Sequence, residues 1–426
     1  PQAKCQPSAV ETMVKDAGFQ SLLRSNKALS KLLRNAKSTN RKQQVPVDQA
    51  RNRVLSSRLK APRNIPHYDR AAMDGFAIRA EDTFGATQSS PRRLKLRSAL
   101  VTAIEDGEAV KVNTGAALPK GTDAVLKVES ARETEQQVEA LNPVSPKQNV
   151  GAVGEDVQKG EVILKKDRKL DPPALSLLRS LGIEKVSVWK KPKITVIPTG
   201  EELIPPGNKP VPGEVIESNG LMVKEYVSSW EGKVALEPCY SDQTADLLHS
   251  LSKHEGEPLI IMIGGSSVGE RDQATEALSQ LGSLLFHGVA IQPGKPLCGA
   301  VLNNGSLVVC LPGYPVAALV DSLLFLKPVL EKMTRVTHQS LDPEPSRFQL
   351  GEKIHSKLGM LTVTRVRLSD EKLWPIRTAG AGILTSATAS DGFVLVPEDS
   401  EGKAAGTEIK LHTWDQPPDL RYLEFN

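Results

Sequence analysis

Between residues 193 and 334 the sequence alternates short apolar runs with stretches of helical periodicity, and no other feature constrains the fold as strongly. The apolar runs are residues 194–197, 234–236, 259–263 and 307–310, and the helical windows are residues 221–230, 244–253, 272–281 and 316–333. Strands that alternate with helices form a parallel sheet covered on both faces, and ligands bind at the carboxyl ends of its strands. The sequence therefore predicts a doubly wound, mostly parallel α/β domain with a ligand site at one edge.

The sequence on either side of this stretch predicts smaller units. Two prolines within residues 62–66 end a basic helical pattern, and residues 92–141 then carry short alternating runs broken by glycine and proline, as in a β-rich domain. Asp171 is a suitable N-cap for a second helix, and we expect this helix to pack against the helix of the basic N-terminal segment. After Asp342 the alternation becomes strand-like again, which predicts a C-terminal β domain.

Composition and cysteine spacing argue against several classes of protein. Aromatic residues make up 4% of the chain and the formal net charge is only +4, so we expect no binding to nucleic acid. The apolar runs are far shorter than the roughly 20 residues of a membrane-spanning helix, so we expect no insertion into a membrane. The four cysteines show no C-x-x-C spacing, which argues against a thiolate zinc site or a disulfide framework and favours the reducing cytoplasm.

Three of the predicted strands run into polar loops that contain glycine, at residues 198–203, 264–272 and 311–315. The second loop begins Gly264-Gly265-Ser266-Ser267 ahead of a helix, a pattern that brings backbone N–H groups together around an anion. Lys295 lies in the sequence Pro-Gly-Lys-Pro, where a stiff backbone can direct a cation to a phosphate. These loops predict a phosphate or oxyanion site, although a tight turn would explain the same glycines.

Carboxylates are the second feature of these loops. Glu202 and Asp272 lie in two of them, Asp242 follows the second predicted strand, and Asp74 lies in the sequence Ala-Met-Asp-Gly. Acidic groups beside an anion repel it unless a divalent cation bridges them or one of them acts as a base. The pattern therefore predicts bound Mg²⁺, while helix capping is the alternative for any single carboxylate, above all for Asp272 at the start of a helix.

Several motifs in sequence order resemble the molybdopterin molybdenumtransferases, the molybdenum-insertion enzymes related to the gephyrin E domain. The matching stretches are residues 65–77, 113–125, 154–157, 198–203, 264–272, 293–296, 311–315, 384–386 and 391–392. The resemblance spans residues 45–415, and the ordered set is far more specific than any one motif.

The resemblance implies a multidomain α/β fold and a dimeric enzyme. Its parts are an elongated discontinuous domain (residues 1–60 and 151–191), an inserted β-rich domain (61–150), a molybdopterin-binding-like α/β domain (192–336) and a C-terminal β domain (337–426). It further implies a homodimer whose active cleft lies between the α/β domain of one chain and the inserted domain of the other. Members of the family take adenylated molybdopterin and molybdate and release AMP with the help of Mg²⁺, and we expect the molybdopterin adenylyltransferase as the partner that delivers the substrate.

The same resemblance assigns roles to residues at matching positions. The implied catalytic residues are Asp74, Glu202, Asp242, Asp272 and Lys295, with Asp242 and Asp272 as the metal ligands. The implied substrate-binding residues are Thr114, Gly115, Gly264, Gly265, Ser266, Ser267, Gly294, Pro312, Gly313, Tyr314, Pro315, Arg365 and Ser386. Of these, Arg365 and Ser386 are the candidates for binding molybdate.

The sequence also departs from the family pattern. Tyr314 stands where many relatives have asparagine, and Gln292 stands where a basic residue often precedes the Pro-Gly-Lys-Pro stretch. These departures leave open a preference for tungstate, and residues 1–44 match poorly, so their role is open too. Two other functions are alternatives: a scaffold or binding protein on the gephyrin E fold, and an enzyme that acts on another phosphorylated ligand.

Overall fold

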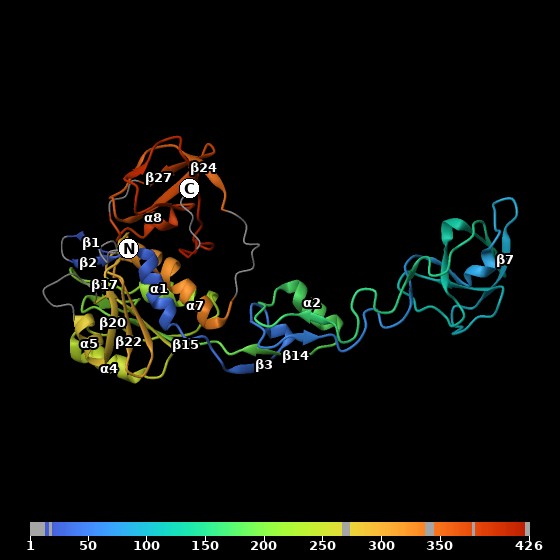
Figure 1. The fold of residues 1–426 in the computed structure, drawn as a ribbon, viewed down its shortest axis with the longest axis horizontal. Coiled ribbons are helices and arrows are strands. Elements are labelled where there is room, and N and C mark those ends of the chain that lie inside the picture. The colour runs from blue at the N-terminus through green and yellow to red at the C-terminus, as the bar shows by residue number, and fades with distance from the viewer. Residues whose placement is uncertain (1–12, 17–18, 266–272, 337–344, 377–379, 422–426) are drawn as a thin grey trace, which may run out of the picture. The chain divides into compact units, whose positions relative to one another are not determined.

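The computed structural model describes residues 13–16, 19–265, 273–336, 345–376 and 380–421. The chain divides into two compact units, one of residues 1–43 and 189–426 and the other of residues 44–188 (Figure 1). Each unit is described by itself below.

The larger unit is built on a six-stranded sheet. The strand order is β18 (Lys233–Leu236), β15 (Lys193–Pro198), β19 (Leu259–Ile263), β23 (Leu307–Leu311), β22 (Cys298–Leu302) and β20 (Gly282–His287). The first four strands are parallel; β22 then pairs antiparallel with β23, and β20 pairs antiparallel with β22. Every residue of β19 and β23 is buried, because helices cover both faces of a parallel sheet. The predicted mostly parallel α/β sheet is confirmed.

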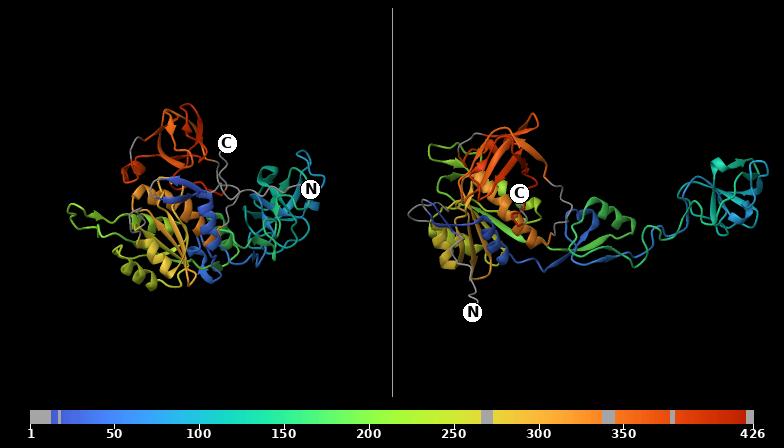
Figure 2. Two further views of the ribbon diagram at one scale, coloured as in Figure 1. Left: turned by 60° about the vertical axis from the view of Figure 1, so that its left-hand side comes forward. Right: turned by 45° about the horizontal axis from the view of Figure 1, so that its top comes forward.

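Two layers of helices cover the sheet. One face packs against α3 (Asn219–Ser229) and against a continuous helical run of α6 (Pro315–Asp321), the π-helical segment η4 (Ser322–Leu326) and α7 (Lys327–Thr334). The other face packs against α4 (Thr244–Lys253) and α5 (Gln273–Leu281). Figure 2 shows the yellow α4 and α5 on one side of the sheet, with the blue α1 and orange α7 on the other.

Helix α1 (Ser25–Asn35) belongs to the larger unit. Its residues Ala28, Leu29 and Leu32 are buried in the core that α3, α6 and α7 share with the sheet, and α1 contacts α7 (Figure 1). Helix α2 (Pro172–Ser180) lies in the smaller unit. The expectation that these two helices pack together is therefore wrong, because the apolar stripe of α1 is buried against the α/β core instead.

A second β-sheet lies in the C-terminal part of the larger unit, as predicted. Its strands are β21 (Ile291–Gln292), β26 (Leu361–Ser369), β27 (Lys372–Pro375), β24 (Arg347–Leu350) and β30 (Glu408–Lys410), with β28 (Gly392–Val396) paired to β26, and the short helix α8 (Thr385–Thr388) follows β27. Residues of β26 and β28 share one apolar core with α6, η4 and α7. This explains why α6 and η4 are buried on almost every side.

The smaller unit contains the predicted β-rich region. Its six-stranded sheet has the order β10 (Ala131–Glu133), β11 (Gln137–Ala140), β7 (Arg92–Arg97), β8 (Glu108–Val112), β6 (Gly75–Ile78) and β9 (Ala124–Lys127). Helix α2 begins as predicted, because the Asp171 side chain accepts a hydrogen bond from the Ala174 N–H (2.9 Å) and Pro172 occupies the first turn. Its residues Ala174 and Leu178 pack on the apolar core that includes Leu55 and Val186.

Short two-stranded ribbons complete the described part of the chain. They are β1 (Met13–Asp16) with β2 (Phe19–Leu23), β3 (Lys42–Pro46) with β14 (Lys185–Trp189), β4 (Leu59–Lys60) with β13 (Val162–Leu164), β5 (Arg70–Ala71) with β12 (Val150–Gly151), β16 (Leu203–Ile204) with β17 (Val215–Ile216), and β25 (Ile354–His355) with β29 (Gly402–Lys403). Three single turns of 3₁₀ helix, η1 (Val47–Gln49), η2 (Ala80–Thr83) and η3 (Val128–Ser130), lie in the smaller unit. Among the described helices, none is long and apolar enough to cross a membrane.

Candidate functional site

A pocket of about 670 Å³ lies at the carboxyl ends of β15, β19 and β23 in the larger unit. It is lined by Pro198, Thr199, Gly200, Glu202, Leu203, Val215, Ile216, Glu217, Ser218, Asn219, Asp242, Ile263, Gly264, Gly265, Gln273, Pro296, Pro312, Gly313, Tyr314, Pro315 and Gly382. The lining includes eight of the residues predicted from the sequence: Glu202, Asp242, Gly264, Gly265, Pro312, Gly313, Tyr314 and Pro315. The pocket therefore occupies the edge of the sheet at which ligands of α/β folds bind.

Backbone hydrogen bonds hold the three strand-end loops against one another. The Thr199 N–H donates to the Ile263 carbonyl (2.8 Å), and the Gly264 N–H donates to the Leu311 carbonyl (3.0 Å). Gly264 has a φ of +100°, and a β-carbon there would clash with the Thr199 carbonyl oxygen. The glycine thus permits the close approach of two loops, and its own N–H is already used within the protein.

Glu202 and Asp242 present their carboxylates at the pocket. The Glu202 carboxylate lies over Gly200, where a β-carbon would come within 2.7 Å of both carboxylate oxygens. Glu217 also lines the pocket, but its Oε1 accepts a hydrogen bond from the Gly220 N–H (2.5 Å) in the first turn of α3. Glu202 and Asp242 are therefore the two lining carboxylates that the structure does not assign to a helix cap.

The loop after β23 links the pocket to the C-terminal part of the unit. The Val316 N–H at the start of α6 donates to the Ala381 carbonyl (2.9 Å), and the Asn219 side-chain amide donates to the Gly313 carbonyl (2.7 Å). The Tyr314 side chain is 68% exposed, and a β-carbon at Gly382 would lie 3.4 Å from its ring. Tyr314 thus offers an exposed aromatic face at the rim of the pocket.

Sequence reasoning missed several lining residues, including Glu217, Asn219 and Gln273. Asn219 and Gln273 are the first residues of α3 and α5, and Glu217 lies in the short segment between β17 and α3, outside the three loops singled out in the sequence. The spacing of Glu217 from Gly220 is a helix-capping signal, and it could have placed a helix start, and hence these side chains, at the same edge of the sheet.

Other predicted residues of the larger unit do not line this pocket. Gly294 has a φ of +123° and packs directly on the Asp321 carboxylate, and the backbone of Lys295 accepts a hydrogen bond from the Val289 N–H (2.9 Å). Arg365 is buried within β26, and burial lowers the pKa of its guanidinium. The Ser386 hydroxyl donates to the Ile383 carbonyl (2.6 Å) in the turn that opens α8. The structure therefore brings Pro296, but not these four predicted residues, to the pocket lining.

Asp74 and Thr114 meet each other in the smaller unit. The Thr114 backbone N–H (2.6 Å) and its hydroxyl (2.8 Å) both donate to Asp74 Oδ1. These hydrogen bonds, the one from the backbone first, lower the pKa of the Asp74 carboxyl. The neighbouring Gly115 has a φ of +85°, and its N–H donates to the Ala71 carbonyl (2.8 Å). The pair is thus an exposed carboxylate held ionised and oriented by its neighbour.

Ser266, Ser267 and Asp272 lie outside the described residues. Within the described residues, no three or more His, Cys, Asp or Glu side chains are grouped so that they could hold a metal ion.

The fold and the pocket together define a class: multidomain α/β proteins with a pocket at the carboxyl edge of a mostly parallel sheet. Family models place the chain more narrowly. Residues 23–182 match the MoeA N-terminal region (domains I and II), residues 195–332 match a probable molybdopterin-binding domain, and residues 347–414 match the MoeA C-terminal region (domain IV).

Individual relatives agree with the family models. The molybdopterin molybdenumtransferase of Haemophilus influenzae is 31% identical over 92% of this chain and 99% of its own length. The enzyme of the same name from Synechococcus elongatus is 30% identical over 87% of this chain and 94% of its own. The crystal structure of a molybdopterin biosynthesis MoeA protein from Pyrococcus horikoshii superposes with a TM-score of 0.77 at 33% identity and covers 92% of this chain and 100% of that one. The chain belongs to the MoeA family of molybdopterin molybdenumtransferases, as its motifs indicate.

Proposed function

We propose that this protein is a molybdopterin molybdenumtransferase that inserts molybdate into adenylated molybdopterin, with Mg²⁺ and with release of AMP, in the final step of molybdenum cofactor biosynthesis. The observation that carries the proposal is the pocket in which Glu202 and Asp242 lie beside the Gly264–Gly265 turn and the loop after β23. Its place at the carboxyl edge of the sheet suits a phosphorylated ligand. The relatives from Haemophilus influenzae and Synechococcus elongatus are named molybdopterin molybdenumtransferases, which supports the transfer of molybdenum to molybdopterin.

The carboxylates of the pocket suit magnesium. Mg²⁺ in phosphate-handling sites takes one or two protein carboxylates and completes its octahedron with water and substrate phosphate oxygens. Asp242 and Asp272 are the proposed ligands, and Glu202 offers a further carboxylate in the pocket that Asp242 lines. Bound there, the ion would neutralise charge on the oxygens of the phosphoanhydride.

The protein's own groups would orient the two substrates. Tyr314 offers an exposed ring at the pocket rim, where a planar pterin could stack, and Pro312 and Pro315 stiffen the same loop. Lys295, Ser266 and Ser267 are proposed to bind phosphate, and Arg365 and Ser386 to bind molybdate. Gly294 would let the Lys295 turn pack closely on α6, since its φ of +123° and its contact with Asp321 leave no room for a side chain.

The homodimer, the cytoplasmic location and the delivery of substrate by a molybdopterin adenylyltransferase belong to the same proposal. In a homodimer, Asp74 and Thr114 of one copy would complete the pocket of the other, as the family resemblance implies. Mixing Asp74→Asn and Asp242→Asn variants tests this arrangement, because reassociated mixed dimers would recover activity that neither variant has alone. No recovery after exchange of subunits would contradict the shared site.

The test of the function is AMP release by the purified full-length chain from adenylated molybdopterin. We expect release to require both molybdate and Mg²⁺ and to stop when a chelator removes the metal. Asp242→Asn should lower the rate about 100-fold, because a neutral amide holds the cation poorly. Glu225→Gln, an exposed position on α3, is the matched control and should leave the rate unchanged. AMP release by Asp242→Asn at the parent rate would overturn the proposal.

A further inference from the structure

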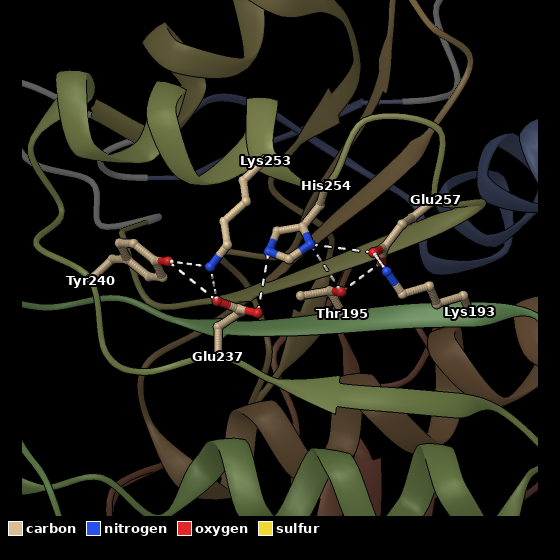
Figure 3. Close-up of polar contacts among 7 residues, drawn as sticks. All are labelled: Lys193, Thr195, Glu237, Tyr240, Lys253, His254 and Glu257. Carbon is tan, nitrogen blue, oxygen red and sulfur yellow. Dashed lines mark hydrogen bonds and ion pairs between the residues drawn. The ribbon is translucent and has the colours of Figure 1, made fainter.

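Seven polar side chains from β15, from the segment that follows β18 and from the end of α4 and the turn after it form a continuous cluster, and none of them lines the pocket (Figure 3). We call it the edge network; its members are Lys193, Thr195, Glu237, Tyr240, Lys253, His254 and Glu257. One end is Lys193 at the start of β15, and the other is Tyr240, two residues before Asp242. The network therefore runs from the amino end of β15 to the segment that carries Asp242, one of the pocket carboxylates.

Glu237 joins the two ends of that segment. It follows β18 directly, and its Oε2 accepts hydrogen bonds from Lys253 Nζ (2.8 Å) and from the Tyr240 hydroxyl (3.3 Å). Lys253, 16 positions after Glu237, is the last residue of α4, so the Glu237 carboxylate closes the loop and helix that lie between them. The hydrogen bond from Lys253 holds the pKa of Glu237 below its ordinary value, so the Glu237 carboxylate is ionised at neutral pH.

The His254 imidazole lies between the Glu237 carboxylate and the buried carboxylate of Glu257. Its Nε2 lies 3.5 Å from Glu237 Oε1, and its Nδ1 lies 3.3 Å from Glu257 Oε1. Glu257 is itself held by Lys193 Nζ (2.6 Å) and by the Thr195 hydroxyl (2.5 Å). Lys193 and Thr195 belong to β15, so the end of α4 is fixed to the strand whose other end carries Glu202.

The backbone carries this anchoring to the pocket. The Glu237 N–H donates to the Val196 carbonyl (2.9 Å), and the Tyr240 N–H donates to the Pro198 carbonyl (3.0 Å). The Gly200 N–H then donates to the Tyr240 carbonyl (3.0 Å). The backbone of Tyr240 is thus hydrogen-bonded to Pro198 and Gly200, the residues on either side of Thr199. A shift of the segment around Tyr240 would therefore move Asp242 relative to Glu202.

We propose that Glu237 is a positioning residue for Asp242: together with Lys253, His254 and Tyr240 it fixes the distance between the two pocket carboxylates without touching substrate. The proposal rests on the proposed function where it concerns catalysis, because Asp242 is there a ligand of Mg²⁺. Groups that orient metal ligands are commonly worth 10- to 100-fold in metal affinity or activity.

The first test compares Glu237→Gln with the parent in AMP release at varied Mg²⁺ concentration. The amide keeps the size of the side chain but cannot form the ion pair with Lys253 that the carboxylate forms. We expect the Mg²⁺ concentration for half-maximal rate to rise about 10-fold, with a smaller change in the rate at saturating Mg²⁺. Glu231→Gln is the matched control, because Glu231 is a buried carboxylate paired with Lys191 (2.8 Å) in the same unit, away from the pocket lining.

A second pair of variants keeps the test decisive if Glu237→Gln folds poorly. Lys253 is half exposed, so Lys253→Met should fold, and we expect it to raise the half-saturating Mg²⁺ concentration about threefold. Lys253→Arg retains a cation that can donate to Glu237 and should restore the parent value. If Lys253→Met and Lys253→Arg raise the half-saturating Mg²⁺ concentration equally, the charge of Lys253 does not act through Glu237.

Amide hydrogen exchange gives a readout that does not depend on the enzymatic activity. Exchange at residues 239–243 should become about 10-fold faster in Glu237→Gln, while Glu231→Gln should leave these residues as in the parent. If the parent releases no AMP, the proposed function fails, and the exchange data still decide whether Glu237 anchors the Asp242 segment. Parent-like exchange together with parent-like Mg²⁺ dependence in Glu237→Gln would overturn the inference.

Discussion

Glu257 and Asp321 are both buried carboxylates of the larger unit, yet their surroundings differ in a way that separates the effect of burial from the effect of partners. Glu257 is 6% exposed and is contacted by Lys193, Thr195 and His254. Asp321 is fully buried, and among the described residues neither of its oxygens has a hydrogen-bond partner. Burial raises the pKa of Glu257, but the hydrogen bonds together bring it below its ordinary value, whereas burial alone raises the pKa of Asp321 well above its ordinary value.

The comparison shows that partners, rather than depth, decide whether a buried carboxylate is ionised in this fold. Glu257 lies just before β19, at the amino ends of the parallel strands, where the exposed Lys193 side chain reaches it. Asp321 is the last residue of α6, in a helical run whose neighbours are apolar and where the π-helical segment begins. The ion pair between Glu257 and Lys193 can hold the end of α4 against β15. The raised pKa of Asp321 favours its neutral form, which can pack closely against the backbone of Gly294.

The largest effect is expected from removing the partnered carboxylate. Glu257→Ala leaves the Thr195 hydroxyl and the His254 imidazole buried without their acceptor, which costs about 2–3 kcal/mol of unfolding free energy. At roughly 2–4 °C per kcal/mol, the calorimetric transition of this unit should fall by about 5–10 °C. Lys193→Met, which removes only the 63% exposed cation, is the control and should have a much smaller effect. If both variants melt at the parent temperature, the edge network does not stabilise the fold.

An intermediate and pH-dependent effect is expected at the carboxylate without partners. The raised pKa of Asp321 means that, above about pH 4, the folded chain retains a proton that the unfolded chain has released, so this group's contribution to stability falls as pH rises through the folded-state pKa. Asp321→Asn has no such titration. It should match the parent near pH 4 and exceed it by about 1–2 kcal/mol at pH 8, measured by urea unfolding at both pH values. The same difference at pH 4 and pH 8 would show that Asp321 does not titrate in this window.

The sequence could reveal the sheet and its ligand edge, because β19 and β23 are apolar at every position and the loops after them contain glycine. It could not reveal the strands β22 and β20 that pair antiparallel: β20 has an exposed leucine, Leu284, and follows α5 directly, so no periodicity marks its start. The surface against which α1 packs could not be predicted either, since an apolar stripe identifies a buried face but not the surface that covers it.

The residues of the candidate site can likewise be divided into those that the sequence predicts and those that it does not. Glu202, Asp242 and the Pro312–Pro315 loop meet because the carboxyl ends of parallel strands share one edge of the sheet, which the order of elements dictates. The different surroundings of Glu257 and Asp321 could not be predicted. Nothing in the local sequence shows that Glu257 pairs with a lysine of β15 or that Asp321 lies in a helical run packed between two sheets. Arg365 and Ser386 were assigned from motif positions, and the structure places neither in the pocket lining.

The smallest effect is expected where a carboxylate has partners but little burial. Asp171 caps α2 through the Ala174 N–H (2.9 Å) and contacts Arg168, and the backbone hydrogen bond lowers the pKa of its carboxyl. Asp171→Ala should cost about 1 kcal/mol of unfolding free energy at pH 7, the usual value of an N-cap, and Asp171→Ser should recover most of it. Because the pKa is lowered, the advantage of the parent is present at neutral pH and is lost as pH falls through the folded-state pKa, so urea unfolding at pH 7 and pH 3 measures both. A cost at Asp171 as large as that at Glu257 would mean that burial adds nothing to the strength of a partnered carboxylate, and the contrast drawn from Glu257 and Asp321 would fail.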